Sequence, residues 1–349
     1  MLLQELSTAI GVSGDEGAVR SLIHTAISPY VTDIHVDSMG NLTALKKGTG
    51  ATPLRVMIDA HMDEVGFIIT GYENDGLLRF AAIGGLDDRI LLGMRVKVGK
   101  KGQQGLIQSV PIHFGREGAV KVIKDLRIDI GATNKAATEG VVSLGERAYF
   151  DSEYVQLSDT VVRGKAFDDR VGCSILIDIL QSETPYPIDI LASFAVQEEV
   201  GLRGAKIAAH RLKPDMAIAL EGTTAHDIPL GDADPDDLMK ANPATRMGNG
   251  PVISVLDPRF ITPPQLLNFA RETARKHNIP FQHKTALGGG TDVGAIHLVH
   301  SGVPSLVVSM PCRYIHSPQA LLNLTDYANM LKLVQTMLHE IQPTHLQPL

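Results

Sequence analysis

The stretch LRVMIDA, at Leu54–Ala60, decides the fold, because it is an almost continuous apolar run of strand length. Such a run is typical of a strand that is buried on both faces of a sheet. PIDILASFAV at Pro187–Val196 and PSLVVSM at Pro304–Met310 have the same character. Strands of this kind need helices on both sides, so the three runs predict a layered α/β fold.

Helical patterns lie around and between these runs. The expected helices are Asp15–Ser28, Arg170–Gln181, Leu202–Leu212, Pro264–His277 and Asp326–Ile341, with Ser13 or Asp15 available to cap the first. Strands that alternate with helices predict a mostly parallel sheet with helices on both faces. A chain of 349 residues is long for a single core, so we expect two domains or one domain with a large insertion.

The segment from Tyr72 to Ser158 has a different character. It is rich in glycine and contains short strand-like pieces at Leu78–Ala82, Arg95–Val98 and Gly140–Leu144, with few long helical patterns. We therefore predict a small β-rich domain at residues 72–158, inserted into an α/β domain formed by residues 1–71 and 159–349.

Composition excludes several classes of protein. The net charge is -7 and no long basic run occurs, which argues against nucleic acid as a partner. An acidic residue, Glu5, stands where a signal peptide carries basic ones, and no apolar stretch approaches the roughly 20 residues of a membrane helix. Cys173 and Cys312 are too few for a disulfide framework and lack zinc-finger spacing. We expect a cytoplasmic protein with no membrane partner.

Residues that could bind metal or take part in catalysis lie at the ends of the predicted strands, where α/β sheets bind their ligands. His61 follows the first strand directly, and Asp63 points to the same side of an extended chain, where its carboxylate can hold the imidazole. Asp168 and Asp169 precede a helix, and a carboxylate there could bridge two metal ions or only cap the helix. His61 and Asp63 alone are a weak signal, and a capped, hydrogen-bonded surface turn explains them as well.

The remaining strand ends carry acids and a second histidine. Glu198 and Glu199 follow the second strand, and adjacent side chains diverge, so one can bind metal while the other faces a water. Glu221 closes a strand-like piece, and His316 follows the third strand. Each of these residues could alone be structural. Together they form a nitrogen-and-carboxylate set without thiolate, suited to two divalent cations that share one carboxylate.

Six motifs carry a resemblance to a known family. They are AHMDEVGF at Ala60–Phe67, IDIGA at Ile128–Ala132, GKAFDDRVGC at Gly164–Cys173, VQEEVGLRGA at Val196–Ala205, GGTDVGA at Gly289–Ala295 and RYIHS at Arg313–Ser317. The chain resembles the metallopeptidases that include the tetrahedral aminopeptidases and bacterial glutamyl aminopeptidases, some of which carry an endoglucanase label. The motifs span almost the whole chain in the family's order.

The resemblance implies an α/β peptidase domain of the phosphorylase/hydrolase-like kind, interrupted by a PDZ-like domain, and two divalent metal ions per subunit. These would be Zn²⁺ or Co²⁺, with Mn²⁺ as a further option. In the implied site, Asp168 bridges the two ions and Asp169 caps the helix. His61 and Glu221 are terminal ligands, on one ion or on opposite ones. The family more commonly has Asp at the position of Glu221.

The second ion is completed, by the same resemblance, by Glu199 and His316. Glu198 is then the general acid and base, and Asp63 orients His61. The glycine-rich loop before Asp292 offers backbone amides, at Gly289 and Gly290, that together with the Asp292 carboxylate could meet the substrate's carbonyl or free amine. A turn with a capping Asp explains the same loop.

These observations predict an exo-acting metallo-aminopeptidase that cleaves peptides and assembles as a homo-oligomer, by resemblance a dodecamer with contacts through the insert. Three alternatives stay open. A metal-dependent deacylase or amidohydrolase would use the same ligands. A glycosidase would need two carboxylates about 5–9 Å apart and would leave the histidines unexplained. A non-catalytic scaffold would have no need for Glu198.

Overall fold

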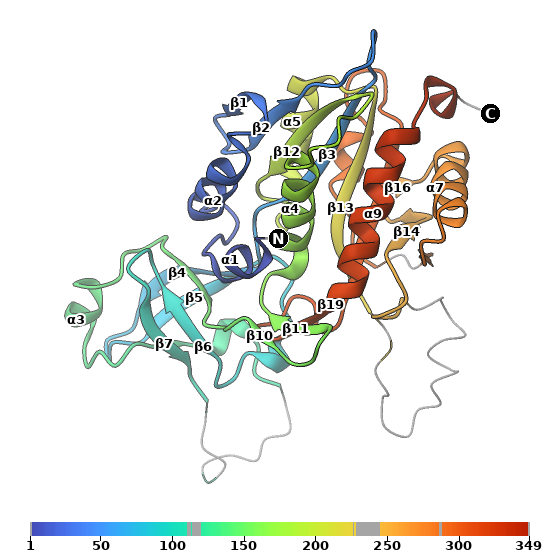
Figure 1. The fold of residues 1–349 in the computed structure, drawn as a ribbon. Coiled ribbons are helices and arrows are strands. Elements are labelled where there is room, and N and C mark those ends of the chain that lie inside the picture. Colours follow the sequence, from blue (N-terminus) through green and yellow to red (C-terminus); the bar gives the residue numbers. More distant parts are fainter. Residues whose placement is uncertain are drawn as a thin grey trace.

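The computed structural model describes residues 2–109, 113, 120–225, 227, 245–285 and 288–347, and they form two bodies: an α/β layered body and a β-barrel at one end of it (Figure 1). An eight-stranded sheet runs through the first body. In spatial order its strands are β1 (Thr32–Val36), β2 (Leu42–Lys46), β12 (Asp189–Ala195), β3 (Arg55–His61), β13 (Met216–Thr224), β18 (Ser305–Cys312), β14 (Val252–Ser254) and β17 (Gln282–Lys284).

The centre of this sheet is parallel, as the three apolar runs predict. Strands β12, β3, β13 and β18 pair in parallel, whereas β2 runs antiparallel to β12 and β14 runs antiparallel to β18. Every residue of β12 and of β18 is buried, which explains their continuous apolar character. The sheet is therefore mixed, with a parallel core.

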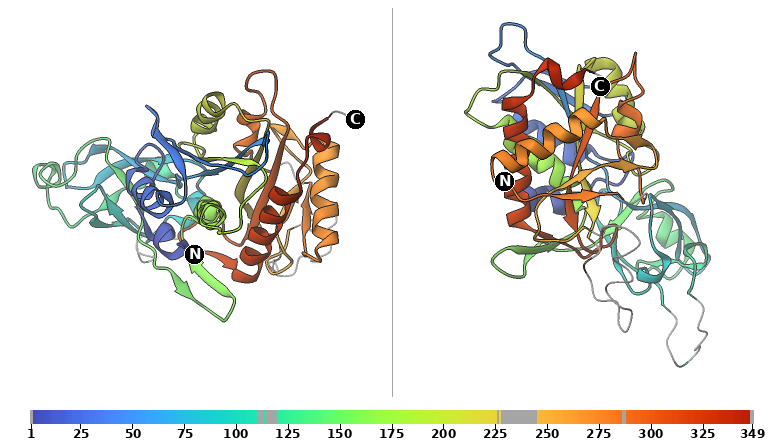
Figure 2. Two further views of the ribbon diagram at one scale, coloured as in Figure 1. Left: turned by 45° about the horizontal axis from the view of Figure 1, so that its top comes forward. Right: turned by 90° about the vertical axis from the view of Figure 1, so that its right-hand side faces the viewer.

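Helices cover both faces of the sheet (Figure 2). They are α1 (Leu3–Thr8), α2 (Gly17–Ile27), α4 (Phe167–Leu180), α5 (Arg203–Leu212), α7 (Pro264–Lys276), α8 (Val293–Ile296) and α9 (Leu324–Glu340). In β3, Val56 and Ile58 pack into one core with α2, α4, α7 and α9, and Met57 points to the other face, where α5 and α8 lie. The five predicted helices are all present, each within three residues of its expected bounds.

The predicted β-rich segment forms a closed barrel with the strand order β4-β5-β8-β7-β6-β9. The strands are β4 (Gly66–Tyr72), β5 (Leu78–Ile83), β6 (Arg95–Val98), β7 (Gln103–Ile107), β8 (Ile128–Asp129) and β9 (Arg147–Phe150), and helix α3 (Lys135–Glu139) lies between the last two. Phe67 fills the barrel core and contacts Phe80 and Phe150 edge to face. The barrel begins with Gly66, ahead of the predicted boundary at Tyr72, and its likeness to a PDZ domain stays a prediction.

The predicted strand at Gly140–Leu144 is wrong. Helix α3 ends there and the chain turns, so the last barrel strand is β9, which pairs with both β4 and β6. Val141 and Leu144 are exposed, and only Val142 enters the barrel core. A short apolar run can thus form a turn rather than a strand, because the burial of one of its side chains is enough to anchor the turn.

Smaller elements complete the α/β body. A three-stranded sheet consists of β10 (Val155–Gln156), β11 (Val161–Gly164) and β19 (Ala320–Asn323), and a hairpin consists of β15 (Leu256–Asp257) and β16 (Phe260–Ile261). Three short 3-10 helices lie at Asp88–Ile90, Ile123–Asp125 and Pro343–Leu346. Throughout the described ranges, we find no helix with the length and apolar character needed to cross a membrane.

Candidate metal centre

The carboxyl ends of the central strands bring the predicted ligands to one place. His61 is the last residue of β3, and Glu221 lies within β13 beside it in the sheet. Glu198 and Glu199 lie in the turn after β12, and His316 follows β18. Parallel strands end at the same edge of a sheet, so residues far apart in the sequence converge there.

Asp168 lies between the two histidines. Its Oδ1 atom is 3.2 Å from Nε2 of His61, and its Oδ2 atom is 3.3 Å from Nε2 of His316. One carboxylate thus presents one oxygen to each imidazole. This is the placement that a bridging ligand between two ions requires.

The other candidate ligands fall into two groups around Asp168. His61 Nε2 lies 3.7 Å from Oε2 of Glu221, and His316 Nε2 lies 3.2 Å from Oε1 of Glu199. Ligand atoms of Asp168, Glu199 and His316 all lie within 4.8 Å of one another, and those of His61, Asp169 and Glu221 do so as well. His61 and Glu221 therefore share one end of the centre, one of the two options that the resemblance left open.

Asp169 was expected only to cap helix α4. Its Oδ1 atom does accept a hydrogen bond from the backbone N–H of Gly172, at 3.0 Å, as a cap would. Its Oδ2 atom accepts from the backbone N–H of His61, at 3.2 Å. Because both carboxylate oxygens are engaged by backbone donors, Asp169 supports the end of β3 although it is close to His61 and Glu221.

Asp63 does more than the sequence indicates. Nδ1 of His61 is 3.1 Å from the backbone oxygen of Asp63 and 3.5 Å from its carboxylate, so both groups face the imidazole. The carboxylate also accepts hydrogen bonds from the backbone N–H groups of Glu198 and Glu199, at 2.9 and 3.2 Å. Asp63 thereby ties the end of β3 to the turn that carries both glutamates.

Two further supports were missed by sequence reasoning. The Ser13 hydroxyl donates to Asp63 at 2.6 Å, so it does not cap α2, whose N-terminus has no side-chain cap. Nδ1 of His316 is 2.9 Å from the backbone oxygen of Gly85, which follows barrel strand β5. A backbone oxygen leaves no sequence signal, and a serine far from its partner could not be paired with it from the sequence.

The centre concentrates negative charge in a buried place. Burial raises the pKa of Glu198 to about 8; the charges of Glu199 and Asp168 also raise it, and His61 lowers it. Burial likewise raises the pKa of Glu221 well above its usual range. Although burial alone would raise the pKa of Asp168, hydrogen bonds to His316 and His61 hold it below its usual range. The site therefore favours groups of positive charge between these carboxylates.

Divalent cations fit this donor set. Imidazole nitrogens and carboxylate oxygens are ligands for borderline and hard cations, and no thiolate is among the grouped residues. Both histidines show a pKa above the usual range; burial opposes this shift, and neighbouring carboxylates cause it, with Asp168 the largest favourable contributor for each. Bound cations would supply the positive charge that the imidazoles otherwise take up as protons.

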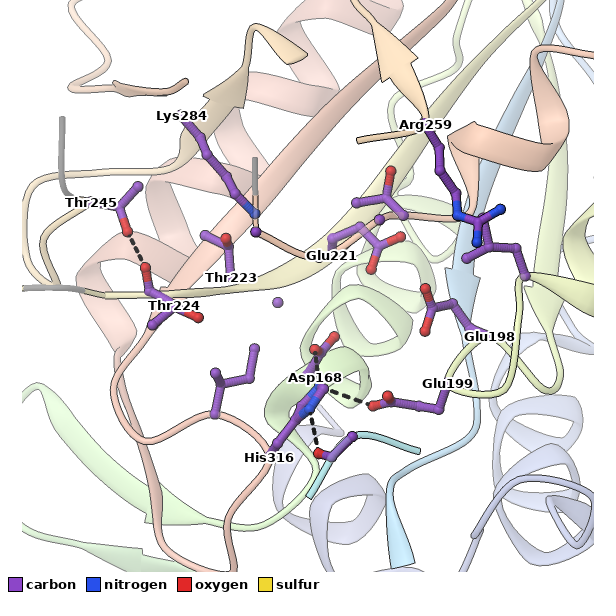
Figure 3. A pocket seen from close by; sticks show the side chains of 18 of the residues that line it. Asp168, Glu198, Glu199, Glu221, Thr223, Thr224, Thr245, Arg259, Lys284 and His316 are labelled. Atoms are coloured by element: carbon purple, nitrogen blue, oxygen red, sulfur yellow. Dashed lines mark hydrogen bonds and ion pairs between the residues drawn. The ribbon is translucent and has the colours of Figure 1, made fainter. Parts of the chain in front are cut away.

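A pocket of about 540 Å³ opens onto the centre (Figure 3). Its lining includes Asp168, Glu198, Glu199, Glu221 and His316. Gly289 and Gly290 also line it, as the sequence led us to expect of substrate-binding residues. Asp292 does not: it is 1% exposed, and its backbone N–H donates to Glu221 at 3.1 Å.

The chain also matches known proteins along its length. Residues 40–333 match the model of the M42 glutamyl aminopeptidase family. The chain belongs to this family of aminopeptidases. Lysyl aminopeptidase from Pyrococcus furiosus is 30% identical over an alignment of 356 positions, which covers 99% of each chain.

Solved structures agree with this assignment. A TET aminopeptidase from the marine sediment archaeon Thaumarchaeota archaeon SCGC AB-539-E09 is 35% identical, with a TM-score of 0.92 over 99% of this chain and 98% of the other. Pyrococcus horikoshii TET1 peptidase, described as assembling into a tetrahedron or a large octahedral shell, is 32% identical, with a TM-score of 0.85 over 97% and 98%. This M42 protein is an aminopeptidase, and its family of metallopeptidases implies divalent metal ions.

Proposed function

We propose that this M42 aminopeptidase removes N-terminal residues from peptides with two divalent cations, held by His61 and Glu221 at one end and by Glu199 and His316 at the other. The Asp168 carboxylate would be shared between the two cations. The observation that carries the proposal is the Asp168 carboxylate, whose two oxygens lie 3.2 and 3.3 Å from the two imidazoles. Zn²⁺ or Co²⁺ suits nitrogen and carboxylate ligands, and Mn²⁺ is compatible with the three carboxylates.

When bound, the cations supply Lewis-acid polarisation of the scissile carbonyl and lower the pKa of a water. Glu198 then takes the proton of that water and delivers it to the nitrogen of the departing peptide. Its placement supports this role, because Oε2 of Glu198 lies 3.9 Å from Nε2 of His61 and the side chain lines the pocket. Asp63 holds the imidazole of His61 and the backbone of Glu198 in one arrangement.

We further propose that residues 72–158 act as an oligomerisation domain and that the protein forms a homododecamer in the cytoplasm. The barrel is a closed body beside the site, and the Pyrococcus horikoshii relative is described as forming a tetrahedron or an octahedral shell. Light scattering on the purified protein should give the mass of about twelve subunits. A monomer at micromolar concentration would contradict the assembly and leave the catalytic proposal standing.

Removal and return of metal tests the catalytic proposal. After chelation, elemental analysis should show loss of about two equivalents per subunit, and hydrolysis of aminoacyl p-nitroanilides should fall to background. Titration with Zn²⁺, Co²⁺ or Mn²⁺ should restore activity, with saturation near two equivalents. Full activity in protein shown to be free of metal would refute the mechanism.

A further inference from the structure

The two histidines of the candidate centre are supported by different parts of the chain. Nδ1 of His61 lies 3.1 Å from the backbone oxygen of Asp63, two residues further along the same segment. Nδ1 of His316 lies 2.9 Å from the backbone oxygen of Gly85, which is 231 positions away in the sequence and follows barrel strand β5. The support of His316 therefore comes from the barrel.

The Gly85 oxygen determines which form of the His316 imidazole is stable. A carbonyl oxygen can only accept a hydrogen bond, so Nδ1 of His316 must carry the hydrogen in this contact. In the neutral imidazole, Nε2 then offers its lone pair, and this atom lies 3.3 Å from Asp168 and 3.2 Å from Glu199 (Figure 3). The barrel backbone thus favours the tautomer of His316 that can bind a metal ion between these carboxylates.

Gly84, the residue before Gly85, packs against the other ligand at this end of the centre. A Cβ atom at Gly84 would lie 3.2 Å from Cβ of Glu199, 3.3 Å from its Oε2 atom and 2.7 Å from Cγ1 of Val65. Gly84 also has a φ of +78°, in the left-handed region that favours glycine. A side chain at this position would have to displace Val65 or Glu199.

We propose that Gly84 and Gly85 are positioning residues for the second ion, the one assigned to Glu199 and His316. The barrel backbone orients the imidazole and confines the carboxylate, and it thereby sets the affinity of this end for its metal. The inference rests on the two-ion function proposed above, and it adds that the two ions depend on different bodies of the protein. The backbone at the end of β5 makes the contacts, so we expect the side chains of the barrel core to take no part.

Two glycine variants separate this role from general backbone strain. Gly84→Ala adds a methyl group against Glu199, and Gly84 is not among the residues that line the pocket. Gly93→Ala is the matched control, because Gly93 is also a barrel glycine with a left-handed φ, of +75°. A Cβ atom at Gly93 would meet no heavy atom of the described residues within 4 Å. Both variants should lose stability through backbone strain, but only Gly84→Ala affects a ligand.

The experiment titrates the metal-free proteins with Co²⁺ by equilibrium dialysis and follows the visible absorption of the bound ion. The wild type and Gly93→Ala should bind two equivalents per subunit. Gly84→Ala should bind one equivalent with wild-type affinity and the other about 10- to 100-fold more weakly, the range expected when a group that orients a metal ligand is disturbed. Excess Co²⁺ should restore kcat on Leu-p-nitroanilide, with KM unchanged.

Further variants identify the weakened ion. His316→Ala should bind a single ion, and Gly84→Ala added to it should leave the affinity for that ion unchanged, because the ion on which Gly84 acts is already lost. Gly85→Val is a second test of the barrel contact, should Gly84→Ala fail to fold. Its φ lies outside the left-handed region, and its Cβ atom would lie 3.4 Å from Nδ1 of His316. It should weaken the same ion.

Three results would overturn the role of the barrel. They are two ions bound with wild-type affinity by Gly84→Ala or Gly85→Val, an equal weakening in Gly93→Ala, and a further weakening of the remaining ion in the double variant with His316→Ala. In each case the wild type would still bind two ions, so the proposed function would stand. A wild type that is active but binds no second ion would refute the two-ion function itself.

Discussion

The barrel and the carboxyl ends of the central strands bury different kinds of side chain. In the described part of the barrel, between Gly66 and Phe150, Thr138 is the only buried polar residue, and the core is made of aliphatic and aromatic groups around Phe67. At the strand ends, His61, Asp63 and Glu221 are all buried at 3% exposure or less. Both regions are packed, but only one of them buries charge.

This difference in buried side chains indicates which region contributes mainly to stability and which carries the chemistry. An apolar core gains free energy from burial alone, so each barrel residue contributes to folding without a specific partner. Buried charges lose hydration, and they persist only with partners or ligands. We therefore expect substitutions at the strand ends to change chemistry or cause large losses of stability, and substitutions in the barrel core to lower stability without changing the chemistry.

The largest effect is expected from Glu198→Gln. This variant keeps the size of the side chain but cannot accept a proton, so kcat should fall by about 10²- to 10⁴-fold, or roughly 3–5 kcal/mol of barrier. It should fold and keep both metal ions, as measured by elemental analysis. Added metal should not restore its activity.

Glu199→Gln is the matched control for that experiment. It replaces a charged candidate ligand, 3.2 Å from His316, by a neutral one, so metal content at one end of the centre should fall. Excess metal should restore part of the activity. If Glu198→Gln loses metal while Glu199→Gln retains it, the roles of the two glutamates are reversed.

The next largest effect is expected from Arg170→Met. The Arg170 guanidinium is fully buried and donates to the carbonyl of Met62 at 2.8 Å and to Glu64 at 3.1 Å; Glu64 also binds Lys165. Removal of one partner leaves buried charge and carbonyl groups unsatisfied, at a cost of about 3–5 kcal/mol in the free energy of unfolding. Urea denaturation should show this as a lower midpoint, and an unchanged midpoint would contradict the role of this charge network.

A smaller effect is expected in the barrel core from Phe80→Leu. Phe80 is 6% exposed and packs edge to face on Phe67 at 5.1 Å between ring centroids. The variant should lose about 1–2 kcal/mol of stability through lost packing and the small cavity left behind. Metal content and kcat should match the wild type when light scattering shows the same assembly. A loss of metal would show that the two regions are coupled.

The smallest effect is expected from Glu73→Gln in the barrel. Glu73 pairs with Arg127 at 2.7 Å, but the two side chains are 34% and 25% exposed, so water already screens the charges. The cost should be below about 1 kcal/mol in the same denaturation assay. A loss of stability as large as that of Arg170→Met would contradict the inference that an exposed ion pair in the barrel contributes less than the buried charges at the strand ends.

Much of the fold and of the candidate centre could be predicted because the signals are local. The apolar runs at β3, β12 and β18 mark central strands, and the acids and histidines that follow them mark the sheet edge where they meet. The strand predicted at Gly140–Leu144 is wrong because a short apolar run does not show whether it pairs with another strand or lines a turn.

The sequence by itself determined which residue types are present at the strand ends, and therefore which chemistry is available. Only the tertiary structure decided how they are arranged. That Ser13 binds Asp63, that a barrel carbonyl at Gly85 holds His316, and that Lys284 shares a pocket with Thr223 are contacts between distant segments. No periodicity or local propensity encodes such pairings, because they depend on how the barrel and the sheet pack in space.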